Sequence, residues 1–314
     1  MSTPTGPAPG LPVRMPRPRQ PGRHRKPEPL AAPEGAPALV LAVPGTPDAA
    51  SRSLAEEVVS IARSELPGLH AYIGYVDGGD DEFPALSAVL TRAAADRAAR
   101  LARATEAAEA AGAEAGRAPV LGEDAPDAVV VPLLAGPDSA LTRRIRQAVM
   151  DSRTSAELTE ALGPHPLLAE ALHVRLSEAG LARADRARLF TVATAADGII
   201  LATVGGEDAV QAAGITGMLL AARLAVPVLA AALDVEGSIA KAAEELRGAG
   251  AAQLALAPYL IGPELPEGLL EAAAAEAGCA SGESLGAYPA IGKLVLSQYA
   301  AVLGITPQQA QPLR

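Results

Sequence analysis

The sequence predicts an α/β protein built from two similar modules, each with a parallel sheet flanked by helices. Two observations lead to this prediction. Apolar runs of strand length alternate with segments of helical periodicity, and a set of sequence blocks recurs in the same order in the second half. Strands that alternate with helices in this way form parallel sheets. The chain has 314 residues, of which 49% are hydrophobic, which is enough for two cores.

Three apolar runs in the first half fit buried strands. Ala38–Val43 is apolar on both faces and lies between Pro37 and Pro44, as expected of an internal parallel strand. The runs at residues 71–76 and 128–131 follow at distances that leave room for helices. We expect those helices at residues 51–66, 85–117 and 141–151.

Four blocks of the first half recur in the second. Residues 39–49 align without gaps on residues 199–209. The other three blocks keep their order: residues 74–78, 132–138 and 162–167 match residues 233–237, 258–264 and 285–290. This order indicates a tandem duplication. We divide the chain into a tail at residues 1–36, a first module at 37–165 and a second module at 166–314.

Composition excludes several classes of partner. The net charge is −10, and since residues 1–34 carry +4, the remaining residues carry −14. Such an acidic body repels nucleic acid and anionic membranes. The chain has no Trp and two Phe, too few aromatic rings for base stacking. No uncharged apolar stretch reaches the roughly 18 residues of a membrane span, and no secretory signal is present. We therefore expect a cytoplasmic protein.

The basic tail and the cysteine count fit this assignment. The tail is rich in Pro, Gly and Arg, so it is predicted to be disordered. It is either a solvated extension or an arm for an anionic partner. Cys279 is the only cysteine, which excludes a disulfide framework and a thiolate metal cluster.

Familiar catalytic motifs are incomplete. Residues 282–286 match the nucleophile elbow G-x-S-x-G, but that hydrolase arrangement needs a histidine downstream, and the last histidine is His173. Gly292-Lys293-Leu294 lacks the glycine spacing of a phosphate loop. The four histidines are scattered, and structural or surface roles are expected for His70, His165 and His173.

Carboxylates lie where parallel strands end, which is where such sheets bind ligands. The loop at residues 77–82 holds four acidic residues and has two interpretations. It either coordinates a hard cation through oxygen or is a solvated loop that favours the N-terminus of the next helix. Asp138 and its repeat equivalent Glu264 are expected to lie over the sheet edges.

The blocks at residues 39–48, 129–134, 162–172 and 285–289, in this order, resemble the sirohydrochlorin-type cobalt and iron chelatases. The resemblance is to the long, two-module form of this CbiX-like group, and it covers residues 37–303. It implies insertion of Co²⁺ or Fe²⁺, as substrate, into a tetrapyrrole of the cobalamin or siroheme pathway. It implies a lyase without an organic cofactor.

The resemblance also implies which residues form the site. A family histidine ends the first strand before a glycine turn, and here Gly45 and Thr46 are retained but Pro44 takes the histidine position. A second family histidine follows the third strand, where residues 135–140 contain none. Gly45, Thr46 and Gly136 are the expected ligand-binding turn residues. Glu82 matches a family acidic residue, and with Asp138 it is our candidate for metal binding and proton transfer.

Three hypotheses remain open. The protein is a chelatase that uses carboxylates, with Asp48 beside Glu82 and Asp138; or it binds a tetrapyrrole, a metal or a partner protein without turnover; or it is a dimeric or structural subunit that pairs with an active homologue. Because imidazole both binds borderline metals and accepts protons near neutral pH, its loss favours the non-catalytic hypotheses.

Overall fold

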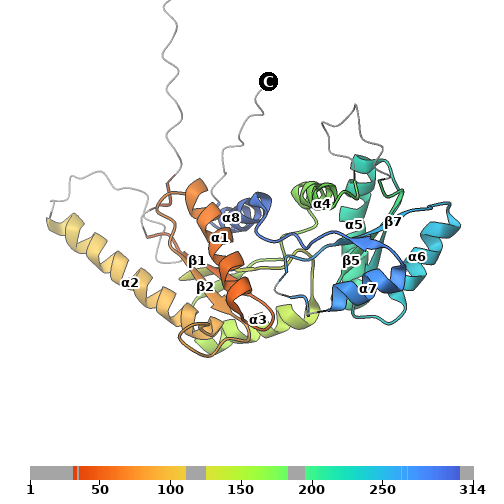
Figure 1. The fold of residues 1–314 in the computed structure, drawn as a ribbon. Helices are drawn as coiled ribbons and strands as arrows, with labels where there is room; N and C mark the ends of the chain where they lie inside the picture. The colour runs from red at the N-terminus through yellow and green to blue at the C-terminus, as the bar shows by residue number, and fades with distance from the viewer. Residues whose placement is uncertain are drawn as a thin grey trace, which may run out of the picture.

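The computed structural model describes residues 31–33, 35–110, 125–182, 195–262, 264–266 and 268–304. These residues form two four-stranded sheets in which every pair of neighbouring strands is parallel (Figure 1). The first sheet has the order β2-β1-β3-β4 and the second has the order β6-β5-β7-β8. The strands are β1 Ala38–Val43, β2 Ala71–Tyr75, β3 Ala128–Pro132, β4 Ala156–Leu158, β5 Gly198–Thr203, β6 Val228–Ala232, β7 Leu254–Pro258 and β8 Ala280–Ser281. The predicted fold class is confirmed, and both halves have the same strand order.

Helices cover both faces of each sheet. One face of the first sheet lies under α1 (Ala49–Glu65) and α8 (Pro289–Val302), and the other lies under α2 (Leu86–Ala110) and α3 (Ser139–Ser152). In the second sheet, α4 (Pro166–Glu178) and α5 (Gly206–Leu224) cover one face. The helices α6 (Ser238–Gly248) and α7 (Leu269–Ala277) cover the other face.

The last helix of each half packs on the other half. Figure 1 shows α8 beside α1, which is far from it along the chain. Conversely, α4 follows the first sheet in sequence but packs on α5 and β7. The Tyr299 hydroxyl of α8 donates a 2.8 Å hydrogen bond to the carbonyl of Pro37, just before β1. As a result, one hydrophobic cluster runs through both halves.

The predicted division between residues 165 and 166 falls at the first residue of α4. That the chain forms two separate modules divided at this point stays a prediction. Residues 1–30 of the predicted tail and residues 111–117 of the predicted long helix lie outside the described residues. None of the helices among the described residues has the length and apolar character that crossing a membrane requires.

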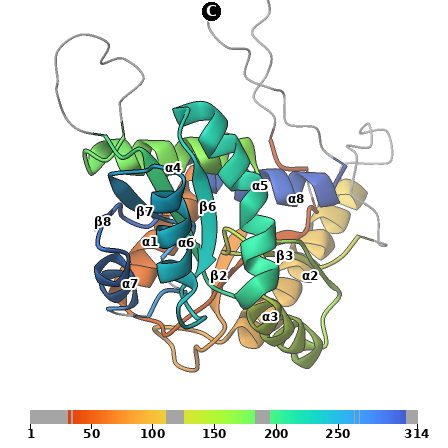
Figure 2. The ribbon, with the colours of Figure 1, turned by 90° about the vertical axis from the view of Figure 1, so that its right-hand side faces the viewer.

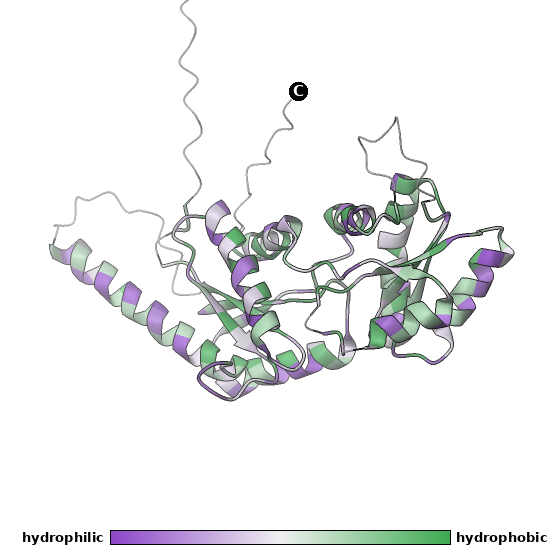
Figure 3. Cartoon of the chain, in the orientation of Figure 1, coloured by the Kyte–Doolittle hydropathy of each residue, from purple (hydrophilic) through white to green (hydrophobic). Residues whose placement is uncertain are grey.

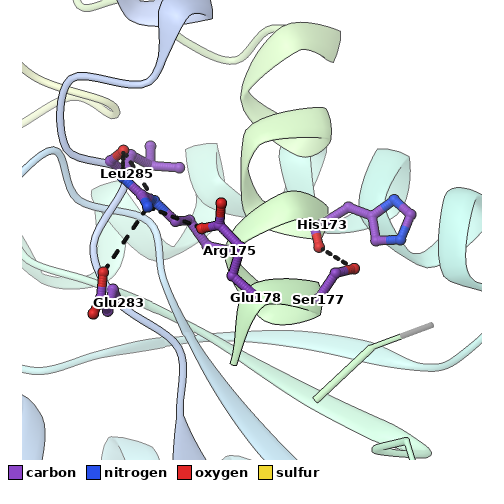
Figure 4. Close-up of polar contacts among 6 residues, drawn as sticks. All are labelled: His173, Arg175, Ser177, Glu178, Glu283 and Leu285. Carbon is purple, nitrogen blue, oxygen red and sulfur yellow. Dashed lines mark hydrogen bonds and ion pairs between the residues drawn. The ribbon is translucent and has the colours of Figure 1, made fainter. Parts of the chain in front are cut away.

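Two side chains brace the connections that cross between the halves. Arg175 of α4 donates from Nε and Nη2 to the carbonyl of Leu285, at 3.3 and 3.0 Å, just ahead of α8 (Figure 4). In the same way, Nε2 of Gln298 in α8 donates to the carbonyl of Ala161, just ahead of α4, at 3.4 Å. Both side chains lie nine residues after the proline that opens their helix. The exchange of helices is therefore nearly symmetric. It also explains the segment at residues 282–286, which is a connection held by Arg175 and not a nucleophile elbow.

Replacing Arg175 with methionine is expected to lower the free energy of unfolding by about 1–2 kcal/mol, because the carbonyl of Leu285 loses its charged donor. Methionine keeps the length of the apolar stem, so most of the packing remains. Urea unfolding of the purified variant measures the effect. Gln298→Met removes a longer, neutral hydrogen bond, so it should lower the free energy of unfolding by less. An equal loss of stability in the two variants would contradict this prediction.

Candidate functional site

The carboxyl ends of the two sheets meet where the halves join. Gly205, after β5, lies so close to the first half that a Cβ on it would be 3.2 Å from the carbonyl oxygen of Pro137. Gly262, after β7, would place a Cβ 3.5 Å from Cδ1 of Leu54 in α1. We call this contact between residues 135–138 and residues 204–206 and 259–264 the junction. It is the edge at which the sequence predicts ligand binding.

Tyr259 is the central side chain of the junction, and the sequence analysis missed it. It is 1% exposed, and its hydroxyl donates to the carbonyl of Ala135 at 2.9 Å and accepts from Oγ1 of Thr216 at 3.2 Å. Burial raises the pKa of Tyr259 to about 12, so the phenol remains a donor at neutral pH. A Cβ on Gly136 or Gly163 would lie 3.0 or 2.1 Å from this side chain, respectively. The two glycines are far from Tyr259 in the sequence, so no local pattern reveals this contact.

The turn after β1 holds the first group of predicted residues. Pro44 has no side chain that can bind metal or accept a proton, and Gly45 has a φ of +81°, which explains why the turn retains glycine. Asp48 caps α1: its Oδ1 accepts from the backbone N–H of Ser51 at 2.6 Å. The hydrogen bonds from Ser51 lower the pKa of Asp48, so this carboxylate is a weak base. Ligand binding by Gly45 and Thr46 stays a prediction.

Glu82 is engaged by an arginine. Nη1 of Arg52 in α1 lies 2.6 Å from Oε1 of Glu82, and the guanidinium group lies 5.6 Å from the centroid of the Phe83 ring. A cation that approaches Glu82 therefore meets a positive charge. The pair is exposed, so it is weak, and a stronger ligand can displace the arginine.

Two other carboxylates of the acidic loop also have partners. Asp77 forms an ion pair with Arg144 of α3, and Oδ1 of Asp80 accepts from the backbone N–H of Phe83 at 2.6 Å. These contacts favour the solvated-loop interpretation over a cation site.

Asp138 and Glu264 are neighbours across the junction. Asp138 caps α3 by accepting from the backbone N–H of Leu141 at 2.8 Å. Glu264 accepts from the N–H groups of Ile261 and Gly262 at 2.7 and 2.9 Å. Burial raises the pKa of Glu264, and the charge of Asp138 raises it further, in spite of the two backbone donors. The two repeat-equivalent carboxylates therefore lie close enough for the charge of Asp138 to act on Glu264.

Glu264→Gln is expected to remove a pH dependence of stability. Because folding raises the pKa of this carboxyl above its ordinary value of 4.5, its contribution is complete below pH 4.5 and is lost as the pH rises through the raised value. The native protein should therefore lose more stability than the variant as the pH is raised from 4.5 towards neutrality. Urea unfolding across this range measures the difference. Glu271→Gln, an exposed change on α7, serves as control, and parallel profiles for the native protein and Glu264→Gln would refute the prediction.

The histidines of the described residues have contacts other than the candidate carboxylates. Nδ1 of His165 accepts from the backbone N–H of Leu167 at 3.1 Å and caps α4, and burial lowers the pKa of His165. His70 precedes β2 and so lies at the opposite end of the sheet from Glu82, where burial, then Arg100 and Arg63, lowers its pKa. His173 is buried on α4 and accepts from Nε of Arg223 at 2.9 Å. Within the described ranges, no three His, Cys, Asp or Glu side chains gather to hold a metal.

A basic helix face begins at the junction and was also missed. Arg143, Arg144 and Arg146 of α3 are exposed, on a helix whose cap is Asp138. Guanidinium groups are suited to carboxylates. The run Arg143-Arg144-Ile145-Arg146, in a part of the chain that carries −14, was the available sequence signal.

Comparisons with known proteins identify the fold. No family model and no curated protein matches the sequence. Among solved structures, SirB from Bacillus subtilis with Fe³⁺ matches with a TM-score of 0.54 at 14% identity, over 85% of this chain and 95% of that chain. A periplasmic ribose ABC transporter from Conexibacter woesei matches at 12% identity over 72% of this chain and 66% of that one, but its TM-score of 0.30 does not indicate a shared fold. The chain therefore has the chelatase-like fold of SirB.

Proposed function

We propose that the protein binds a carboxylate-bearing tetrapyrrole at the junction and does not insert metal. One observation supports the proposal that the protein does not insert metal. Each candidate carboxylate at the strand ends already has a donor within the protein, and Pro44 stands where the family resemblance places imidazole. The role would be that of a carrier or a regulator.

Metal insertion requires a group that takes protons from the pyrrole nitrogens and ligands that hold and release the metal substrate. Imidazole suits both tasks because its pKa is near neutrality and it binds borderline metals. Asp48 is a weaker base than usual, and Glu82 is paired with Arg52. Neither supplies that chemistry in this arrangement.

Tetrapyrrole binding is supported by the fold and by charge. SirB has the same fold, and the arginines of α3 offer guanidinium groups for the carboxylates of the macrocycle. A Cβ on Gly205 would lie 3.2 Å from the carbonyl oxygen of Pro137, so a macrocycle bound at this point of the junction must displace that contact.

A second candidate is an active chelatase that inserts Co²⁺ or Fe²⁺ with Glu264 as base. The observation in its favour is that Glu264, a half-buried side chain beside Asp138, has a raised pKa, because such a carboxyl accepts protons more readily at neutral pH.

Titration with sirohydrochlorin, followed by absorbance with and without Co²⁺ or Fe²⁺, tests both candidates. We expect a spectral shift on binding and no metal insertion above the uncatalysed rate, measured beside a histidine-bearing chelatase. The double change Arg143→Gln and Arg146→Gln should weaken binding about tenfold, which corresponds to about 1.4 kcal/mol. Arg92→Gln with Arg103→Gln, two exposed arginines of α2, is the matched control.

The outcomes separate the hypotheses. No spectral shift removes both tetrapyrrole readings. Insertion above background that is lost in Glu264→Gln supports the second candidate and contradicts the first. Insertion that appears only after Pro44→His with Ala140→His supports a binding scaffold that lacks the catalytic imidazoles.

A further inference from the structure

The strand β6 leaves one side of its backbone unpaired. Within the described part of the chain, β6 pairs with β5 alone, and Figure 2 shows it between α5 and α6 at the edge of the second sheet. The carbonyl of Pro227 accepts from Ile199, and the N–H of Leu233 donates to Thr203, at 3.0 and 2.8 Å. Because backbone groups alternate along a strand, those of Val228, Ala230 and Ala232 point to the outer edge.

A cavity of about 470 Å³ runs along this edge. Ala230 and Ala232 of β6 form part of its floor, and α5 and α6 form its walls on opposite faces of the sheet. Three of its lining residues are glutamates and one is a lysine, and all four are exposed: Glu207, Glu236, Glu245 and Lys241. We call this cavity the β6 groove. Its acidic lining favours a basic occupant.

In the first half, the connection that follows the equivalent strand pairs with one residue of its outer edge. The equivalent strand is β2, whose Tyr75 pairs with Val43 as Ala232 pairs with Thr203. The N–H of Tyr75 donates to the carbonyl of Pro84 at 3.0 Å, and Tyr75 forms a parallel bridge with Ala85. In the second half, the N–H of Ala232 donates to Oγ of Ser238 at 3.0 Å, and the shorter connection leaves the rest of the edge open.

The chain's own N-terminal segment has the pattern that such an edge requires. An added strand needs an N–H on every second residue, and proline is tolerated only where the N–H would face away. Pro12, Pro16 and Pro18 all occupy even positions, so residues 13, 15, 17 and 19 keep their N–H groups on one side. Arg14 lies on one face of such a strand and Arg17 and Arg19 lie on the other. These faces correspond to Glu207 of α5 and Glu245 of α6, which wall opposite sides of the groove.

We propose that residues 12–19 of this chain occupy the β6 groove as an added edge strand. Charge supports this occupant, because residues 1–34 carry +4 and the rest of the chain carries −14. Residues 21–29 also carry their prolines on alternate positions, but they include Glu28, whose side chain would face one of the two acidic walls. The proposal is independent of tetrapyrrole binding.

Hydrogen–deuterium exchange of the full chain, resolved to single amides by NMR, tests the proposal with two proline variants. Arg17→Pro removes an N–H that faces β6, and Arg14→Pro adds a proline where the N–H faces away. Both remove one arginine and both lie outside the described fold, so neither disturbs it. In the native chain and in Arg14→Pro, we expect the amides of Val228 and Ala230 to be protected. In Arg17→Pro, these amides should exchange at least tenfold faster.

Other outcomes overturn the proposal. Equal exchange in both variants would show that residues 12–19 do not pair with β6 in this register. Fast exchange of Val228 and Ala230 in the native chain would show that the edge is free. Protection that grows with protein concentration would assign the groove to a second copy. A further variant, Glu207→Gln with Glu245→Gln, should reduce protection, and unchanged protection at these amides would contradict the charge match.

Discussion

Replacing Gly163 with alanine is expected to destabilise the protein by about 3 kcal/mol or more. The new Cβ would lie 2.1 Å from Oη of Tyr259 and 2.6 Å from the carbonyl oxygen of Ala135. Those two atoms hydrogen-bond each other across the junction, and one of them belongs to the backbone, so neither can move without breaking the contact. The midpoint of urea unfolding measures the loss.

The control for this change is Gly79→Ala in the acidic loop, where a Cβ meets nothing within 4 Å. We expect this control to change stability by less than about 0.5 kcal/mol. If Gly163→Ala were as stable as the control, Tyr259 could not be packed against residue 163. The junction described above would then be wrong.

Gly292→Ala is expected to destabilise the protein by about 2 kcal/mol, although alanine normally stabilises a helix interior relative to glycine by about 1 kcal/mol. Gly292 lies in α8, and a Cβ there would be 2.5 Å from Cγ2 and 2.6 Å from Cβ of Ile61 in α1. A Cβ atom is fixed to the backbone, so the two helices must separate. Thermal or urea unfolding reports the change.

Gly214→Ala in α5 serves as control, and it is expected to stabilise the protein instead of destabilising it. A Cβ at this position meets nothing within 4 Å, so the variant should be more stable by up to about 1 kcal/mol. A stabilised Gly292→Ala would mean that α8 does not lie on α1. The same contact explains why the tripeptide at residues 292–294 holds a glycine without being a phosphate loop.

The long apolar strands could be predicted from the sequence because burial on both faces leaves a continuous apolar run. Ala38–Val43 is buried at every position and was predicted with its observed bounds. The short strands β4 and β8 were missed because they have three and two residues and none is fully buried. Without an apolar run, hydrophobic periodicity has nothing to detect.

The sequence predicted where the candidate site lies but not which contacts its side chains make. The sequence placed Asp138 and Glu264 at equivalent strand ends, and the structure puts them across one junction. The partner of Glu82 is Arg52, 30 residues away, and the partner of Tyr259 is Ala135, 124 residues away. Such pairs depend on how the elements pack, which local pattern does not determine. The exchange of α4 and α8 was missed for the same reason, since an apolar helix face does not say which sheet it covers.

The position of α8 also bears on synthesis. The first sheet leaves the ribosome with one face short of a helix, because that helix comes from residues 289–302. Until those residues emerge, the nascent chain exposes the apolar side chains that Ile291, Val295 and Tyr299 later cover. Native structure in the first half must therefore be completed late in translation or after it. Premature stop codons in the second half would leave an aggregation-prone polypeptide and no autonomous first half.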